Sequence, residues 1–226
     1  MQCVILAAGK GTRMRPLTDA KPKPLLAVAG RPILDHIVEA LPAEITEVVL
    51  IVGYKSELIR SYCGEIFLGK KVTYCEQKNF SGGTGDALLC AKAVLKGKFL
   101  FMYGDDIHGK TALAKVVKED HALLAAQSEQ PERYGVIYTN DTGTLQKIVE
   151  KPTQPDSNLI NIGGFVVDEA IFSYDCDISV LGELLVTDFL TAYAQEYPVK
   201  VIIQDVWIPI GYPEDIEKAE QILLKR

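Results

Sequence analysis

The sequence predicts an α/β fold in which helices cover both faces of a mostly parallel β-sheet. Short apolar runs, the first of them Cys3 to Ala8, have the unbroken pattern of strands that are buried on both faces. Segments with helical apolar spacing alternate with these runs, which indicates strand–helix–strand units. The 226 residues have a mean hydropathy of +0.10, so the chain is long and apolar enough to bury a sizeable core.

In the first half of the chain we predict strands over 3–8, 47–52, 71–76 and 99–103, and helices over 32–41, 56–63 and 85–95. In parallel sheets, ligands bind beyond the carboxyl ends of the strands. The loops 9–13, 77–85 and 104–106 each follow a predicted strand, so we expect them along one edge of the sheet.

The second half of the chain is richer in predicted strands, over 134–139, 144–150, 161–167 and 199–203, with a hairpin turn at Asp141-Thr142-Gly143. Residues 180–196 are predicted to be mostly helical, with a restart and an N-cap near Thr187-Asp188. A last helix is predicted over 213–225, with Pro213 in its first turn. There is no internal repeat or clear linker, which favours one domain over residues 1–226.

Composition excludes several classes of partner. The formal net charge of −6 argues against a nucleic-acid-binding protein, although the cations near the N-terminus suit a local anionic ligand. The five cysteines show no Cys-x-x-Cys pair and are expected to be reduced thiols in a cytoplasmic protein. We expect no signal peptide and no membrane partner, because the first residues form a strand and no apolar run could span a bilayer.

The loop after the first strand has the features of a phosphate site. Gly9-Lys10-Gly11-Thr12-Arg13 directly follows a buried strand, and glycines there let backbone N–H groups approach a phosphate chain. Arg13 and Arg15 add charge suited to phosphate, and Lys23 lies between two prolines that stiffen its segment. The loop matches neither the dinucleotide fingerprint nor the Walker A pattern. Spacing alone leaves a phosphate loop and an ordinary glycine turn both open.

The stretch from Leu6 to Leu26 resembles the signature of the sugar-1-phosphate nucleotidylyltransferases, Leu-Ala-Ala-Gly-x-Gly-Thr-Arg-(Leu/Met)-x-Pro-Leu-Thr followed by Pro-Lys-Pro-Leu. The resemblance implies a Rossmann-like, mostly parallel sheet between helices, with an inserted β-rich sugar-binding lobe. It implies a nucleotide-binding half over approximately 1–120 and a sugar-binding half over approximately 121–226. It also implies Mg²⁺-dependent nucleotidyl transfer from UTP or dTTP to a sugar 1-phosphate. Some members of that family carry a C-terminal left-handed β-helix, which we do not expect here.

The same resemblance assigns roles around the triphosphate. It implies catalytic roles for Arg13, Lys23 and Asp105, with Asp105 as the metal ligand. The implied nucleotide-binding residues are Ala7, Ala8, Gly9, Gly11, Thr12, Arg13, Gln77, Gly82, Gly83 and Thr84. The gap from Gln77 to Gly83 is one residue longer than the usual spacing, so either Gly82 or Gly83 is expected to meet the base.

The sugar phosphate is expected to meet a second set of residues. The resemblance implies sugar-phosphate contacts from Gly135, Glu150, Lys151, Asn161, Glu183 and Thr187. Ordinary alternatives are a surface salt bridge for Glu150 and Lys151, and a helix cap for Thr187.

One position departs from the family pattern. The segment Trp207-Ile208-Pro209-Ile210-Gly211-Tyr212-Pro213 resembles Trp-x-Asp-x-Gly-x-Pro, in which the aspartate is a second metal carboxylate, but Pro209 occupies its place. Either phosphate oxygens and water complete the metal site around Asp105, or Asp106 or Asp205 substitutes, or catalysis is weakened.

Two rival functions therefore stay open. One is a phosphocholine cytidylyltransferase on the same scaffold, in which aromatic residues such as Tyr138, Tyr174 and Tyr193 would surround the trimethylammonium group. The other is a regulatory homologue that binds nucleotide sugars without catalysis, which Pro209 favours. The oligomeric state, a homo-oligomer included, is open as well.

Overall fold

The computed structural model describes residues 1–179, 182–204 and 206–225, and a ten-stranded mixed β-sheet lies at its centre. Four neighbouring strands run parallel, in the order β7 (Phe99–Tyr103), β1 (Gln2–Ala7), β4 (Glu47–Val52) and β6 (Lys70–Glu76). The central strands are buried along nearly their whole length. Their unbroken apolar sequences follow from this position, because each strand has a covered face on both sides.

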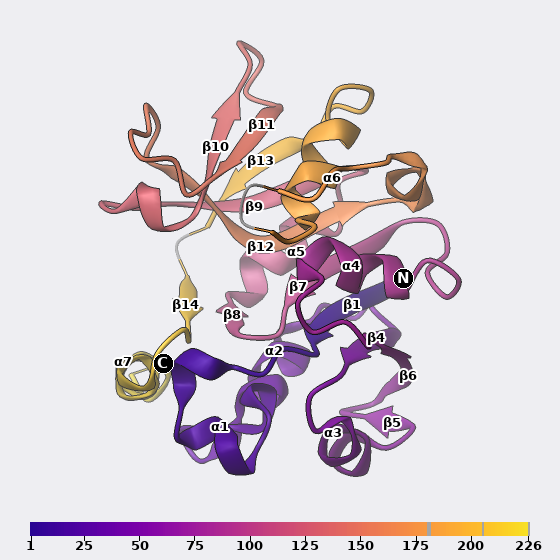
Figure 1. Ribbon diagram of the computed structural model, residues 1–226, viewed down its shortest axis with the longest axis vertical. Helices are drawn as coiled ribbons and strands as arrows, with labels where there is room; N and C mark the ends of the chain where they lie inside the picture. Colours follow the sequence, from indigo (N-terminus) through magenta and orange to yellow (C-terminus); the bar gives the residue numbers. More distant parts are fainter. Residues whose placement is uncertain (180–181, 205, 226) are drawn as a thin grey trace.

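Helices cover both faces of this parallel region (Figure 1). Cys3 and Ile5 point into one apolar layer and Val4 points into the other, as the two-residue period of a strand requires. The first layer is closed by α2 (Ile33–Ala40), α3 (Ser56–Cys63) and α5 (Lys110–Val116), and the second by α4 (Gly83–Cys90) and α6 (Val186–Tyr193).

The second half of the chain extends the sheet with mostly antiparallel pairs. The long strand β12 (Leu159–Val167) runs antiparallel beside β7 and connects the two halves. It also pairs with β10 (Gly135–Thr139), which forms a hairpin with β11 (Leu145–Glu150), and with β9 (Ala122–Gln127), which pairs with β13 (Lys200–Ile203). Figure 1 shows β10, β11 and β13 at one end of the molecule and α1 (Leu17–Ala20) and α3 at the other.

Short ladders bring distant segments together. The strand β8 (Asp106–His108), just after β7, pairs with β14 (Trp207–Pro209) near the C-terminus. The helix α7 (Pro213–Leu223) follows β14 and packs against β2 (Ala27–Val28), which pairs with β3 (Arg31–Pro32). The two-residue strand β5 (Ile66–Phe67) closes the edge of the sheet beside β6. The C-terminal segment therefore lies beside the loop that follows β1 (Figure 1).

The fold class predicted from the sequence is confirmed, together with most of the elements. The bounds of β4, α3 and β7 agree with the predicted ranges, and α2, β6, β10, β11, β12, β13 and α7 differ by one or two residues at an end. The three loops expected along one edge do follow β1, β6 and β7 at the carboxyl ends of parallel strands.

Two helix predictions need correction. The helix predicted over 85–95 is α4 over Gly83–Cys90, because tight backbone turns at Lys92 and Val94 replace the helical pattern. Residues 182–185 are not helical, and residues 180–181 lie outside the described residues. The backbone N–H and C=O of Leu184 instead pair with Gly82 O and Gly85 N at 3.0 and 2.8 Å, so they cannot join a helix. Thr187 is thus inside α6 and is not its N-cap.

The sequence analysis did not predict α5, β9, β8 and β14, nor the short elements α1, β2, β3 and β5. Within the described ranges, none of the helices is long and apolar enough to cross a bilayer.

Candidate functional site

The glycine loop is folded back onto the segment that carries Lys23. Gly11 has a φ of +59°, and a side chain at this position would begin 3.0 Å from Thr18 Cγ2 and 3.1 Å from Lys23 Cβ. Thr18 Oγ1 donates to Gly11 O at 2.9 Å, and Tyr54 N donates to Ala8 O at the same distance. A glycine is required at position 11 both for the left-handed backbone and for this close approach.

Lys23 and Asp105 form an ion pair at the centre of the sheet edge. Lys23 Nζ lies 2.6 Å from Asp105 Oδ2, and only 8% of Lys23 is exposed. Asp105 follows Gly104, where a Cβ would lie 2.1 Å from Leu6 O. The close contact of Gly104 with β1 thus puts the carboxylate directly beside the glycine loop. The two side chains come from positions 82 residues apart in the sequence.

The β8–β14 ladder shows where Pro209 lies, the residue that replaces the second metal carboxylate of the family pattern. Pro209 is the register partner of Asp106, and Ile210 N donates to Asp105 O at 3.0 Å. Burial, and then the neighbouring charge of Asp105, raise the pKa of Asp106 well above its usual range. Asp106 is therefore a buried, readily protonated acid behind Asp105, whereas the side chain of Asp105 is 35% exposed. The other candidate substitute, Asp205, lies outside the described residues.

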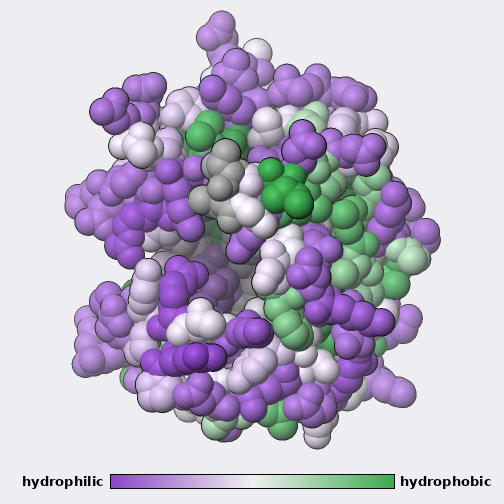
Figure 2. Space-filling model, in the orientation of Figure 1, coloured by the Kyte–Doolittle hydropathy of each residue, from purple (hydrophilic) through white to green (hydrophobic). Residues whose placement is uncertain are grey.

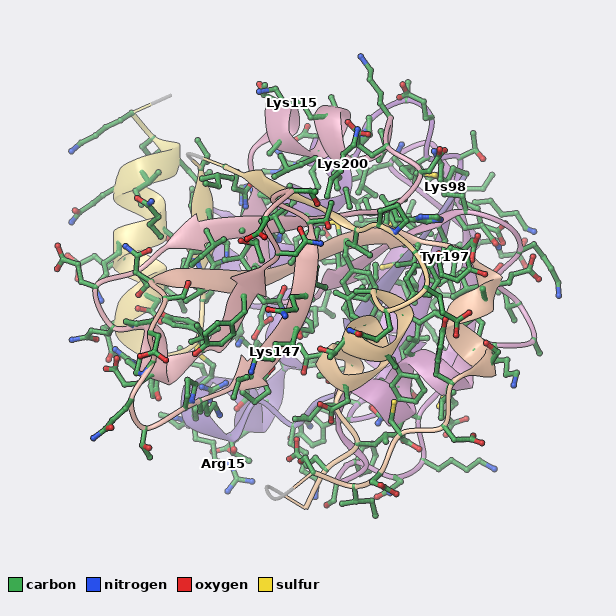
Figure 3. The ribbon with its side chains drawn as sticks, turned by 90° about the horizontal axis from the view of Figure 1, so that it is seen from above. Arg15, Lys98, Lys115, Lys147, Tyr197 and Lys200 are labelled. Atoms are coloured by element: carbon green, nitrogen blue, oxygen red, sulfur yellow. The ribbon has the colours of Figure 1, made fainter. Side chains whose placement is uncertain are left out.

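The cations of the loop differ in where they point. Lys10 and Arg13 are exposed and lie over aromatic rings, with Lys10 Nζ 5.4 Å from the centroid of Phe80 and Arg13 Cζ 5.3 Å from that of Tyr212. The Arg13 guanidinium lowers the pKa of the Tyr212 hydroxyl. Arg15 instead pairs with Asp19 at 3.3 Å and points outward from the edge of the molecule (Figure 3). Lys10 and Arg13, but not Arg15, are thus available to an anion at the loop.

The loop after β6 holds the side chain of Gln77 in a fixed direction. Gln77 is 6% exposed, and its Nε2 donates to Gly83 O at 3.0 Å and to Asp86 Oδ2 at 2.9 Å. Gly83 has a φ of +83°, and a Cβ there would lie 2.4 Å from Leu184 O. Thr84 Oγ1 accepts a hydrogen bond from Val186 N at 3.0 Å. Gly83 and Thr84 therefore pack against residues 183–186, the segment that leads into α6.

Three of the expected sugar-site residues meet in the β-rich half. Gly135 and Glu150 are register partners, and a Cβ on Gly135 would lie 2.8 Å from Glu150 Oε1. Thr187 Oγ1 donates to Glu150 Oε1 at 3.0 Å. Burial raises the pKa of Glu150, and the hydrogen bond from Thr187 opposes this shift. The surface salt bridge and the helix cap considered for these residues are thus wrong for Glu150 and Thr187.

Lys151 and Glu183 are exposed near this group. The backbone of Lys151 has a φ of +44°, and its N–H donates to Tyr134 O at 2.9 Å. Glu183 lies against the Gly83 backbone, since a Cβ on Gly83 would begin 2.8 Å from Glu183 Cβ.

Tyr103 connects the two groups of residues, and the sequence analysis did not select it. A Cβ on Gly163 would lie 1.9 Å from Tyr103 Cδ2, so the ring packs directly on that backbone. Asn161 Oδ1 accepts from Gly163 N at 3.1 Å, which fixes the strand beneath the ring. Burial, and then the charges of Glu150, Asp106 and Asp105, raise the pKa of Tyr103, which therefore stays a neutral hydroxyl. The sequence signal that could have identified Tyr103 is its position immediately before Gly104-Asp105.

The predicted site residues thus form two neighbouring groups, one on the parallel strand ends and one in the β-rich half. Figure 2 shows a hollow on this face of the molecule, between the end that carries β10 and β11 and the end that carries α1 and α3.

The residues that could hold a metal ion are few. Across residues 1–179, 182–204 and 206–225, no three His, Cys, Asp or Glu side chains gather as a metal-binding group. Asp105 offers a carboxylate, one oxygen of which is bonded to Lys23. Mg²⁺ accepts few protein ligands and readily binds phosphate oxygens. These residues therefore fit an ion shared between Asp105 and a phosphate chain, and do not fit one held by side chains alone.

The aromatic residues considered for a trimethylammonium ligand do not form an accessible cage. Tyr193 is fully buried and stacks on Tyr197, and its ring also contacts Tyr174 with centroids 6.1 Å apart. Tyr138 lies elsewhere, on β10, with Lys147 Nζ 5.0 Å from its ring centroid.

The model of the nucleotidyl transferase family matches residues 2–226 of the chain. The chain belongs to this family. It is 38% identical to the UTP–glucose-1-phosphate uridylyltransferase AglF of Haloferax volcanii, over 99% of this chain and 96% of that protein. It is 37% identical to the bifunctional protein GlmU of Methanocaldococcus jannaschii, over 100% of this chain and 55% of that protein. The chain thus spans about half the length of the GlmU relatives it matches.

Two solved structures of related proteins have the same fold as this chain. A Bacillus anthracis protein with a provisional assignment as a glucose-1-phosphate thymidylyltransferase, in complex with a sucrose, superposes with a TM-score of 0.85 at 26% identity, covering 98% of this chain and 94% of that one. A UDP-glucose pyrophosphorylase complexed with UDP-glucose superposes with a TM-score of 0.84 at 22% identity, covering 99% and 98% of the two chains. At 22% identity, the comparison with the UDP-glucose pyrophosphorylase shows a shared fold alone.

Proposed function

We propose that this chain transfers a nucleotidyl group from UTP or dTTP to a sugar 1-phosphate, giving a nucleotide sugar and pyrophosphate. A phosphate oxygen of the sugar 1-phosphate attacks the α-phosphorus, a new P–O bond forms, and the bond to the β-phosphate breaks. The nucleophile is already an anion, so no strong base is needed. The difficulty is to bring two polyanions together and to stabilise the charge that develops.

The observation that carries this proposal is the Lys23–Asp105 pair beside the glycine loop. It brings an ammonium, a partly exposed carboxylate and a backbone turn to one edge of the sheet. In the proposed role, the backbone from Ala7 to Thr12 cradles the triphosphate and Arg13 stabilises the departing pyrophosphate. Lys23 contacts the phosphates at the reaction centre.

We propose Mg²⁺ as the cofactor, held by Asp105 together with phosphate oxygens of the substrate. When bound, the ion would neutralise charge that develops on these oxygens. The Asp105 carboxylate would orient the ion, and Lys23 would keep one Asp105 oxygen in place.

The remaining residues are assigned by their position. Gln77 and Gly82 are proposed to meet the base, because Gly83 and Thr84 pack against residues 183–186, the segment that leads into α6. The sugar phosphate is proposed to meet Gly135, Glu150, Lys151, Asn161, Glu183 and Thr187. Residues 1–226 would act as one domain, with the nucleotide on the first half and the sugar on the second.

The test is pyrophosphate release by Lys23→Met and Asp105→Asn, with Lys21→Met as the matched control. Lys21 is exposed two residues from Lys23, so its variant removes the same charge from the same segment. Each site variant should lose at least about 100-fold in turnover, the scale for losing one preorganised electrostatic partner. The control should keep the wild-type rate. A near-normal rate in both site variants would contradict the proposal.

A further inference from the structure

The side chain of Arg13, on the glycine loop, lies over the ring of Tyr212, in the C-terminal segment. Arg13 Cζ is 5.3 Å from the centroid of this ring. The guanidinium also hydrogen-bonds to the Tyr212 hydroxyl, which lowers the pKa of that group. A guanidinium has five N–H donors, so contact with one aromatic residue leaves most of them free for an anion.

The backbones that carry the two side chains are both held in place. Arg13 lies in a tight turn that ends at Met14, whose side chain is fully buried. At the other side of the contact, Asp215 Oδ2 accepts hydrogen bonds from the backbone N–H groups of Gly211 and Tyr212, at 3.0 and 2.9 Å. The ring of Tyr212 is therefore presented to Arg13 by a fixed segment of the chain.

Arg13 differs from its neighbour Arg15 in its partners. Within residues 1–179, 182–204 and 206–225, none of the ion pairs involves Arg13, whereas Arg15 pairs with Asp19 at 3.3 Å. A long, exposed side chain has many rotamers, and ordering it when a ligand binds costs conformational entropy. The aromatic ring restricts the Arg13 side chain and, unlike a carboxylate, does not neutralise its charge.

We infer that Tyr212 is a positioning residue whose ring holds the Arg13 guanidinium ready for the two terminal phosphates of the nucleoside triphosphate. This inference rests on the proposed function, in which Arg13 stabilises the departing pyrophosphate. Because the guanidinium is ordered in advance, less conformational freedom is lost on binding and the phosphates bind more tightly. The segment that has Pro209 in place of the carboxylate of the family pattern thus still contributes to the site, through Tyr212.

The test compares the binding of UTP and UMP to the wild type and to Tyr212→Leu, measured by calorimetry. UMP lacks the two terminal phosphates, so the ratio of the two dissociation constants reports the contacts made to them. The wild type should prefer UTP, and Tyr212→Leu should reduce this preference about two- to fivefold, the range of an exposed cation–π contact. A structural defect alone would weaken the binding of both nucleotides and leave the ratio unchanged, and an unchanged ratio would overturn the inference.

A double-mutant cycle shows whether Tyr212 acts through Arg13. In the Arg13→Met background, Tyr212→Leu should not change the ratio further, because the cation that the ring holds is gone. An equal effect in both backgrounds would overturn the inference. Tyr212→Phe keeps the ring and should keep the wild-type preference. A preference as low as that of Tyr212→Leu would contradict the role of the ring.

Tyr138→Leu is the matched control. Tyr138 also has a cation over its ring, with Lys147 Nζ 5.0 Å from the centroid, but it lies on β10, away from the glycine loop. This variant should keep the wild-type ratio of dissociation constants. An equal change in Tyr138→Leu and Tyr212→Leu would show that the effect is not specific to the Arg13 contact.

Turnover separates this inference from the proposed function. If the wild type releases no pyrophosphate with any sugar 1-phosphate, the proposed function fails. A preference for UTP over UMP that falls in Tyr212→Leu, but not when Arg13 is already replaced, would still support the role of Tyr212. A wild type that binds UTP and UMP equally would overturn that role.

Discussion

At the edge of the sheet, the charged side chains of Lys23 and Asp105 need a partner because they are partly shielded from water. Lys23 is 8% exposed, and a buried ammonium without a partner is strongly unfavourable. Asp105 provides the partner at 2.6 Å, while its own side chain stays 35% exposed. Removing Asp105 would leave the Lys23 charge unpaired, so Asp105→Asn, which keeps an oxygen beside Nζ, is a better test of function than truncation to alanine.

At the same scale, Glu150 and Thr187 form a buried hydrogen-bonded pair that we assign to the sugar. Glu150→Gln keeps the shape of the side chain but removes the charge that accepts from Thr187 Oγ1 at 3.0 Å. We expect the KM for the sugar 1-phosphate to rise about tenfold or more, as for the loss of a buried charged hydrogen-bond partner. The KM for UTP should change little, because Gln77 and the glycine loop are unaffected. Steady-state kinetics with each substrate varied in turn will show this, and equal changes in both KM values would contradict the assignment.

At the scale of elements, the approach of β7 to β1 determines where the carboxylate lies. The backbone of Gly104 passes so close to Leu6 O that a Cβ would lie 2.1 Å from it. Strand pairing between Leu6 and Tyr103 ends just before this contact, and Asp105 emerges immediately after it. The position of Asp105 is thus fixed by two neighbouring parallel strands and does not depend on a long loop.

Gly104→Ala should therefore destabilise the protein. The added methyl must push the end of β7 away from β1, and overpacking of this kind costs typically about 1–3 kcal/mol. Urea denaturation of the variant and the wild type measures the change in the free energy of unfolding. Gly211→Ala is the control: its Cβ would meet only Asp215 Oδ2, at 3.6 Å, and a surface change of this kind stays within about 0.5 kcal/mol. Equal stability of Gly104→Ala and the control would show that the contact is unimportant.

At the scale of the whole molecule, the sequence predicted what depends on local pattern. The parallel strands β1, β4 and β7 appear as unbroken apolar runs, and the loop from Gly9 to Arg13 appears as a motif, so both could be placed before the structure. The β8–β14 pairing could not be predicted, because three-residue strands about 100 positions apart leave no periodic signal. The contact of Thr187 with Glu150 and the packing of Tyr103 on Gly163 also depend on tertiary structure, which no spacing in the sequence reveals.

The site was predictable to a similar extent. Lys23 and Asp105 were selected separately, and the structure brings them into contact. Asp86 was not selected, because an aspartate in the first turn of a helix is common and its hydrogen bond to Gln77 is visible only in three dimensions.

The β8–β14 junction also predicts how stability depends on pH. Burial lowers the pKa of His108 from 6.5 to about 4, and the hydrogen bond between Gln204 Nε2 and His108 Nδ1 only partly opposes this shift. Between these values the unfolded chain binds a proton that the folded chain does not, so stability falls as the pH drops from 6.5 towards 4. The full effect is about 3 kcal/mol at about 1.4 kcal/mol per pKa unit. Asp106, whose pKa is raised, acts in the opposite direction, so the comparison must isolate His108.

Urea denaturation of the wild type and of His108→Gln at pH 7 and pH 5 makes this comparison. The wild type should lose more stability than the variant between the two pH values, since glutamine does not titrate. An identical loss in both proteins would show that His108 does not contribute.

The central claim is that the chain is a catalytic nucleotidyltransferase for sugar 1-phosphates in spite of Pro209. The measurement that tests it most directly is pyrophosphate release with Mg²⁺, for UTP, dTTP, CTP, GTP and ATP against several sugar 1-phosphates and phosphocholine. We predict a signal with UTP or dTTP and a sugar 1-phosphate, and none with phosphocholine. A signal that requires CTP and phosphocholine would contradict the claim. So would silence across all combinations with nucleotide binding still detectable, which would make Pro209 the mark of a binding protein.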